Sequence, residues 1–208
     1  MIDNRSLCLD WISEFPRLTQ FKGGRKIIRR SGPVIYGLEL EKYTSRDYRP
    51  KFIALNLLSS HPGFCISSML RSSKGKGVYL EYSNHSIKYH EMANSIKLNF
   101  PLLAENSEGN IKATIIESFQ LEVERSINDY SSPLAIWFSL IQLCIYYGLV
   151  DLLENEKVKM LEYSRGLPSE SPAIFGDFDE FIENELNVTF ETLESRKVVN
   201  ILKGGWNI

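Results

Sequence analysis

The sequence predicts an α+β fold, in which an N-terminal helix and an antiparallel β-meander precede a helical C-terminal half packed on the sheet. Two patterns lead to this prediction. Between residues 26 and 90, short β-favouring stretches alternate with turn signals made of Gly, Pro and Ser. In the second half of the chain, apolar residues recur instead at helical spacing.

The stretch 132–153 is the most apolar of the chain and is predicted to contain a buried helix near 133–147. This helix is apolar on nearly every side, and a helix of that kind must be buried on every side. The run is too short and too often interrupted by polar residues for a membrane span, so no membrane association is expected. We expect a single α+β domain over 1–208, sheet-rich over 1–104 and helical over 105–208.

The first half is interpreted as one helix followed by strands. Leu7, Trp11 and Phe15 give an apolar side to a helix over 6–21, which Pro16 ends or kinks. Short connections favour an antiparallel meander over parallel crossover units. Strands are expected over 26–30, 34–43, 51–58 and 64–70, with a polar loop at 45–50 and the arms of a last hairpin at 78–82 and 87–89.

The second half is interpreted as a series of helices. Ile111, Ile115, Phe119, Val123 and Ile127 follow one another at four-residue spacing, which places them along one face of a helix. The other helices are expected over 91–100, 133–147, 154–163 and 177–186.

The composition is that of an ordinary globular protein of 208 residues, with 43% apolar and 24% charged residues. The N-terminal residues contain no apolar run of signal-peptide length, so the protein is expected to be cytoplasmic. Cys8, Cys65 and Cys144 are far apart and lie among apolar neighbours. An odd number of scattered cysteines is typical of free thiols in a reducing compartment.

The net charge of −2 conceals an uneven distribution along the chain. Residues 1–104 carry 16 Lys and Arg against 8 Asp and Glu, whereas residues 105–208 carry 8 against 18. The two halves therefore have formal charges of +8 and −10. Such asymmetry indicates attraction between the halves, a well-solvated surface or binding surfaces of opposite sign, and the sequence leaves these readings open.

No motif for catalysis, metal binding or cofactor binding is visible, so the sequence predicts a protein that is not an enzyme and needs neither cofactor nor metal. His85 and His90 flank a predicted strand arm, whose alternation would turn them to opposite faces, and His61 is distant. The chain has no Gly-x-Ser-x-Gly nucleophile motif. The loop 72–77 has the wrong residue order for a phosphate-binding loop. A catalytic site assembled from scattered residues stays open.

A basic cluster near residues 25–30 is the main functional feature of the first half. Together with the basic loop 71–76 it would form one patch, on which Tyr79 and Tyr82 would stack bases. The sequence pI of about 6.0 is low for a nucleic-acid-binding domain, so nucleic-acid or nucleotide binding is the second functional hypothesis. Its site residues would be Arg25, Lys26, Arg29 and Arg30.

An acidic, aromatic segment is the main functional feature of the second half. Its carboxylates lie three or four residues apart on the helix predicted over 177–186, where the first of them also favour the helix dipole. Complementary charge raises association rates and aromatic anchors supply much of the binding energy. The leading hypothesis is therefore binding of another protein. The residues expected to contact it are Asp177, Phe178, Asp179, Glu180, Glu183 and Trp206.

In its general layout the chain resembles the immunity proteins of bacterial contact-dependent inhibition and related polymorphic toxin systems. The resemblance is carried by the short helix ending at Phe15 and Pro16, the segment RRSGPVIYGLELEK and the acidic aromatic C-terminal segment. It implies a non-enzymatic protein that neutralises a toxin domain, often a nuclease, by binding over or near its active site. It transfers no site residue. The positive first half would repel a basic nuclease, so the acidic half would make that contact.

Overall fold

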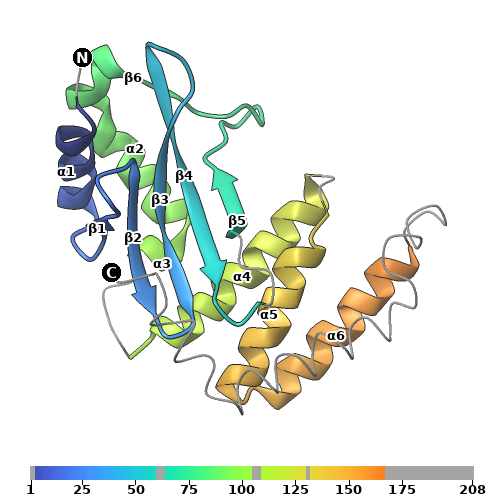
Figure 1. The fold of residues 1–208 in the computed structure, drawn as a ribbon. Helices are drawn as coiled ribbons and strands as arrows, with labels where there is room; N and C mark the ends of the chain where they lie inside the picture. Colours follow the sequence, from blue (N-terminus) through green and yellow to red (C-terminus); the bar gives the residue numbers. More distant parts are fainter. Residues whose placement is uncertain (1–2, 60–63, 105–108, 130–131, 167–208) are drawn as a thin grey trace. The chain divides into compact units, whose positions relative to one another are not determined.

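The computed structural model describes residues 3–59, 64–104, 109–129 and 132–166, and it confirms the predicted α+β class (Figure 1). An N-terminal helix is followed by an antiparallel meander and then by helices. The helix predicted over 177–186 lies outside the described residues. Within the described ranges, no helix is both long enough and apolar enough to span a membrane.

The chain divides into two compact units. The first unit contains the N-terminal helix, nearly all of the sheet and the helical residues up to Ser118, and the second contains residues 56–59 and the chain from Phe119 onward. The division falls within helix α4 (Ile111–Asn128), the helix expected from its four-residue apolar spacing. Organisation of 1–208 as a single domain stays a prediction.

The sheet of the first unit follows the order β1-β2-β3-β4-β5, and the short strand β6 also pairs with β4. Strands β2 and β3 are antiparallel, with Arg29 opposite Tyr36. A Cβ atom on Gly37 would lie 2.0 Å from the carbonyl oxygen of Ile27, so this close approach of the two strands requires glycine. The strands are β1 (Thr19–Gln20), β2 (Lys26–Ser31), β3 (Val34–Lys42), β4 (Asp47–Asn56), β5 (Phe64–Met69) and β6 (Leu80–Glu81).

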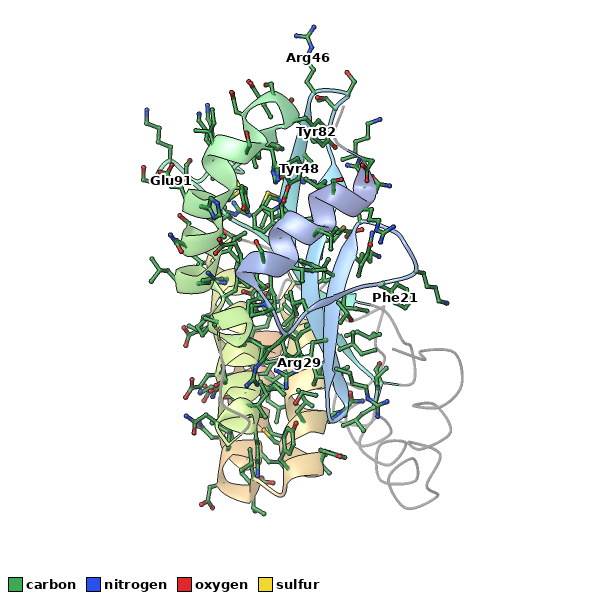
Figure 2. The ribbon with its side chains drawn as sticks, turned by 90° about the vertical axis from the view of Figure 1, so that its left-hand side faces the viewer. Phe21, Arg29, Arg46, Tyr48, Tyr82 and Glu91 are labelled. Carbon is green, nitrogen blue, oxygen red and sulfur yellow. The ribbon has the colours of Figure 1, made fainter. Side chains whose placement is uncertain are left out.

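The helices that lie wholly in the first unit are α1 (Asn4–Glu14), the short 3₁₀ helix η1 (Tyr82–Asn84), α2 (His85–Asn99) and α3 (Pro101–Ala104). Asp3 begins α1, because its carboxylate accepts hydrogen bonds from two backbone N–H groups of the first turn at 2.9 Å. The helix ends before Pro16, as predicted, at Glu14. Figures 1 and 2 show α1 and α2 on the same side of the strands, where they bury apolar side chains.

Two predictions for the first unit are wrong. The predicted polar loop 45–50 is partly strand, because β4 already begins at Asp47 and buries Tyr48. The predicted hairpin arm 87–89 belongs to α2, and only Leu80–Glu81 of the other arm is strand. Local alternation suggested a strand there, but burial of Met92, Ala93 and Ile96 follows helical spacing and decides the outcome.

The second unit confirms the predicted buried helix, α5 (Leu134–Tyr147). Leu140, Leu143 and Cys144 are each 0% exposed. Pro133 is the N-cap residue of α5. Gly148 closes the helix with φ +67°, a left-handed conformation that favours glycine.

A buried carboxylate joins the helices of the second unit. Glu156 of α6 (Val150–Arg165) is 2% exposed and accepts hydrogen bonds from Gln120 at 3.0 Å, Trp137 at 2.9 Å and Lys159 at 2.8 Å. Burial alone would raise the pKa of Glu156, but these hydrogen bonds outweigh it and lower that pKa. The buried charge is therefore paired with donors from α4, α5 and α6.

Candidate functional site

One surface of the first unit brings two exposed tyrosines into contact with an arginine. Tyr43 follows β3 and is 56% exposed, and Tyr79 precedes β6 and is 38% exposed. Their ring centroids lie 4.4 Å apart. The guanidinium carbon of Arg49, on β4, lies 5.6 Å from the centroid of the Tyr43 ring and 5.8 Å from that of Tyr79. We call these three residues the Tyr43–Arg49–Tyr79 cluster.

Arg49 is held in place by its neighbours. Its Nε donates a hydrogen bond to Glu41 of β3, and Lys51 Nζ donates to the same carboxylate at 2.7 Å. Nη1 of Arg49 lies 3.6 Å from the Met69 sulfur. The hydrogen bond from Arg49 lowers the pKa of Glu41, and the same bond raises the pKa of Arg49. Both groups therefore stay charged, and the arginine side chain is fixed beside the two rings.

The local chain geometry explains how the cluster forms. Side chains alternate along β4, so Arg49 points to the face opposite the buried Tyr48. The segment before Tyr79 is a tight turn, in which Gly75 has φ +72° and the Ser72 N–H bonds to the Lys76 carbonyl at 2.8 Å. A Cβ atom on Gly77 would lie 2.8 Å from the sulfur of Met69, so the turn packs closely against this side chain of β5.

The segments that flank the cluster carry positive charge. The chain stretches 42–46 and 71–77 contain lysine and arginine but no acidic residue. Figure 2 shows Arg46 projecting away from the rest of the unit, at the turn between β3 and β4. The exposed cations of the two stretches are Lys42, Arg46, Arg71, Lys74 and Lys76.

The structure does not bring the four residues of the predicted basic cluster onto one surface. Strand alternation places Lys26 and Arg30 on one face of β2 and Arg29 on the other face. Arg29 pairs across the strands with Tyr36 of β3. Lys26 also lies 3.5 Å from the carboxylate of Glu39. Nucleic-acid binding through these residues stays a prediction.

Arg25 is engaged within the first unit. Its Nε donates to Asn4 at 2.7 Å, and its Nη1 donates to the hydroxyl of Tyr82. Tyr82, expected to stack bases, instead stacks on Tyr48 with ring centroids 5.2 Å apart. Figure 2 shows Tyr48 and Tyr82 close together beside α1, with Arg29 farther along the strands.

The predicted protein-binding residues are not tested by the structure. Asp177, Phe178, Asp179, Glu180, Glu183 and Trp206 all lie outside the described residues.

A buried polar chain crosses the other face of the sheet. Trp11 Nε1 donates to the Tyr48 hydroxyl at 2.9 Å, and that hydroxyl lies 2.7 Å from His85 Nδ1. An indole N–H can only donate, so the Tyr48 hydroxyl accepts it. A carboxylate can only accept, so Nε2 of His85 donates to Asp10 Oδ2 at 3.0 Å, and Nδ1 of the neutral imidazole accepts the proton of the Tyr48 hydroxyl. We call these four residues the Trp11–Tyr48–His85–Asp10 chain.

The buried chain contains residue types used in acid–base catalysis, but burial sets its role. Trp11 and Tyr48 are 0% exposed and His85 is 1% exposed. Burial raises the pKa of Tyr48 far above its ordinary value, so the hydroxyl keeps its proton. The chain therefore fixes α1, β4 and α2 to one another, with each of these polar atoms paired.

His90 and the three cysteines are further side chains of potentially reactive type. His85 and His90 were predicted to face opposite sides of a strand, but both lie on helix α2. Nδ1 of His90 lies 2.5 Å from Oε1 of Glu14. Among the described residues, no three His, Cys, Asp or Glu side chains are arranged to hold a metal ion. Cys8, Cys65 and Cys144 are free thiols, and burial raises the pKa of Cys144 to about 11. That shift works against a thiolate at neutral pH.

The sequence interpretation missed two members of the cluster. Arg49 fell in the predicted loop and Tyr43 at the end of a strand, whereas Tyr79 was already expected to offer an aromatic surface. Reading alternation back to Asp47 would have placed Arg49 on the face of the strand opposite Tyr48. Comparison with protein-family models, with curated proteins and with solved structures found no match.

Proposed function

We propose that this protein is a binding module for another protein, and that the Tyr43–Arg49–Tyr79 cluster is the centre of the surface that the partner covers. The observation that supports this most is the pair of exposed tyrosine rings in contact with one arginine. Tyrosine and arginine are enriched among the few residues that supply most of the energy at protein interfaces.

The order of the cluster supports the same proposal. Glu41 holds Arg49, and the tight turn before Tyr79 holds that ring against Tyr43. A surface that is ordered before binding loses less conformational entropy when the partner arrives. Tyrosine adds a large contact area with few rotatable bonds.

The charge around the cluster indicates the chemistry of the partner. The exposed cations of stretches 42–46 and 71–77 surround the cluster along the chain, so an acidic protein surface would be attracted to it. Such steering raises the association rate and weakens as salt is added. The proposed partner is therefore a protein with an acidic surface.

The resemblance to immunity proteins suggests a cognate toxin domain as the partner, and a non-enzymatic role in the cytoplasm. The assignment of the partner as a toxin domain is part of the proposal, and it is supported only by the general arrangement of the chain. The acidic segment with Asp179, Glu180 and Glu183 would form a second surface, suited to a basic partner. The charge of the captured partner distinguishes the two placements of the interface.

The experiment is a quantitative pull-down with the tagged full-length protein from lysate of its own organism, read by mass spectrometry. The wild type is compared with Tyr43→Ala/Tyr79→Ala, with Asp179→Lys/Glu180→Lys/Glu183→Lys, and with Tyr146→Ala. Tyr146 is a matched control, because it is 40% exposed and lies outside the cluster. Nuclease-treated and untreated lysates are run in parallel.

We expect the wild type and Tyr146→Ala to capture one and the same protein, and Tyr43→Ala/Tyr79→Ala to lose it. Nuclease treatment of the lysate should not change this capture. If only Asp179→Lys/Glu180→Lys/Glu183→Lys loses the partner, the interface does not lie at the Tyr43–Arg49–Tyr79 cluster. That result would favour the acidic segment as the interface. Capture that disappears after nuclease treatment would contradict protein binding and favour nucleic acid. A captured partner would then be expressed alone to test whether it is toxic.

A further inference from the structure

The outward side of helix α2 carries two strongly exposed aliphatic side chains. Ile87 is 76% exposed and Leu98 is 83% exposed, the highest values among the large hydrophobic side chains of the described residues. The two residues lie about three helical turns apart, so they point to the same side of the helix. Burial of such side chains in an interface is favourable, because it removes apolar surface from water.

Two polar residues lie between these aliphatic residues and complete a stripe along the helix. The four residues of the stripe are Ile87, Glu91, Asn94 and Leu98, and all of them are exposed. We call them the α2 stripe. They follow one another at intervals of four, three and four residues, which is the spacing of the core positions of a coiled coil. Figure 2 shows Glu91 projecting outward from α2, away from the strands.

The charges that flank the α2 stripe do not oppose contact with a second helix. On one flank, Lys97 Nζ donates a hydrogen bond to Glu14 at 2.7 Å, and His90 Nδ1 lies 2.5 Å from the same carboxylate. These hydrogen bonds lower the pKa of Glu14, so Glu14 stays ionised and balances Lys97. The other flank carries Lys88 and Ser95. One uncompensated cation therefore remains beside the stripe.

A second copy of α2 complements the stripe when the two helices run antiparallel. Two-fold symmetry then sets Ile87 of each chain against Leu98 of the other, and Glu91 against Asn94. The Asn94 amide can donate a hydrogen bond to the facing carboxylate. Lys88 faces Ser95 of the other copy and meets no second cation. Parallel helices would instead set Glu91 against Glu91, which places like charges together.

We propose that the α2 stripe is the contact surface of an antiparallel, two-fold dimer of this protein. The apolar area of four aliphatic side chains is small, so we expect a weak dimer with a dissociation constant on the order of 100 µM. This inference does not depend on the proposed function. Tyr48 points toward α1 and α2 and Arg49 to the other face of the sheet, so the dimer leaves the Tyr43–Arg49–Tyr79 cluster uncovered.

The test is sedimentation velocity of the full-length protein, over a concentration series from about 5 µM to about 1 mM that brackets this constant. We expect the sedimentation coefficient to rise with concentration from that of the monomer toward that of a dimer. Ile87→Gln and Leu98→Gln are each expected to weaken the dimer about tenfold, because symmetry removes each apolar contact twice. Both positions are exposed, and circular dichroism confirms that each variant is folded.

Val150→Gln is the matched control for these substitutions. Val150 is an aliphatic residue that is 66% exposed, and it lies on α6, outside the α2 stripe. The dissociation constant of this variant should equal that of the wild type.

Substitutions of Asn94 test the direction of the helices. Asn94→Lys sets a lysine against Glu91 of the other copy in the antiparallel dimer and is expected to tighten it about fivefold. Asn94→Glu sets two carboxylates together and is expected to weaken it by a similar factor. In a parallel dimer the introduced lysines would face each other, so Asn94→Lys would weaken association.

A wild-type protein that stays monomeric over the whole concentration series would overturn the proposal. So would an unchanged dissociation constant in both Ile87→Gln and Leu98→Gln, because the contact would then lie elsewhere. Weaker association of Asn94→Lys would contradict the antiparallel arrangement. A tenfold loss in Val150→Gln would contradict the placement of the contact on α2.

Discussion

Tyr48 and Arg49 are neighbours on β4, yet they belong to two regions that use similar residue types in opposite ways. Tyr48 is 0% exposed and lies in the Trp11–Tyr48–His85–Asp10 chain, where its hydroxyl both accepts and donates a hydrogen bond. Arg49 lies on the opposite face, between an acidic partner and two exposed tyrosine rings. The alternation of one strand thus separates a structural network from a surface that can be reached from outside.

The difference shows that residue type alone does not reveal a binding site. Both regions combine tyrosine with charged and aromatic neighbours, and both contain stacked or tilted rings. In the buried chain Trp11, Tyr48 and His85 are at most 1% exposed and are paired with one another, so loss of one of them leaves a buried neighbour unpaired. In the cluster the ring faces are partly exposed, so their contribution to folding is small and their contact area is available to a partner.

The largest effect is expected from Tyr48→Ala. The substitution empties a fully buried aromatic position and removes the partner of both Trp11 and His85, so we expect a loss of about 3–5 kcal/mol in the free energy of unfolding. Tyr48→Phe removes only the hydroxyl and should cost about 1–3 kcal/mol. Urea denaturation measures both. A loss of less than about 0.5 kcal/mol in the free energy of unfolding of Tyr48→Ala would contradict the structural role of the buried chain.

The next largest effect is expected on binding, from Tyr43→Ala/Tyr79→Ala. Removal of two interface tyrosines should weaken partner affinity by about 2 kcal/mol or more, which is roughly 30-fold. The free energy of unfolding should change by less than about 1 kcal/mol, because both rings are exposed. Biolayer interferometry and urea denaturation give the two values. Equal losses of stability and affinity would show that the cluster acts only through the fold.

A smaller effect is expected from Glu41→Gln. The amide cannot hold Arg49 by charge, so the arginine becomes less ordered beside the rings and partner affinity should fall a few-fold. Stability should change by less than about 1 kcal/mol, because Glu41 is about one third exposed and exposed ion pairs contribute little. Glu39→Gln is the matched control on the same strand. Unchanged affinity in Glu41→Gln would show that Arg49 does not need this support.

The smallest effect is expected from acid. Lys97 and His90 lower the pKa of Glu14, and Arg49 and Lys51 lower the pKa of Glu41, both from an ordinary value of 4.5. Each group therefore adds stability above that pH and loses it as the pH falls further. Unfolding free energy measured against pH should decline more steeply below about pH 4.5 in the wild type than in Glu14→Gln/Glu41→Gln. Identical curves would contradict these shifts.

The sequence was sufficient where one pattern dominated a long segment. The four-residue spacing from Ile111 and the apolar run of α5 each predicted a helix that the structure contains. It was insufficient where tertiary burial overrides local alternation. Residues 87–89 read as a strand arm, yet they join α2 because the burial of Met92 and Ile96 requires a helix.

The candidate site was predictable only in part. Tyr79 and the basic loop before it were visible in the sequence, but Arg49 meets Glu41, Tyr43 and Tyr79 only through the pairing of β3 with β4 and the turn at Gly75. Side-chain alternation along β2 separates Arg29 from Lys26 and Arg30. The contiguous basic patch expected from sequence proximity did not take that alternation into account.

The most direct test of this account compares the affinity of the captured partner for Tyr43→Ala/Tyr79→Ala and for Tyr48→Phe, at a temperature where both variants are folded. The first variant is expected to keep its stability but to lose at least about 30-fold in affinity, and the second to lose stability but to bind as the wild type does. Full affinity in Tyr43→Ala/Tyr79→Ala, or a loss of affinity in folded Tyr48→Phe of the same size, would contradict it.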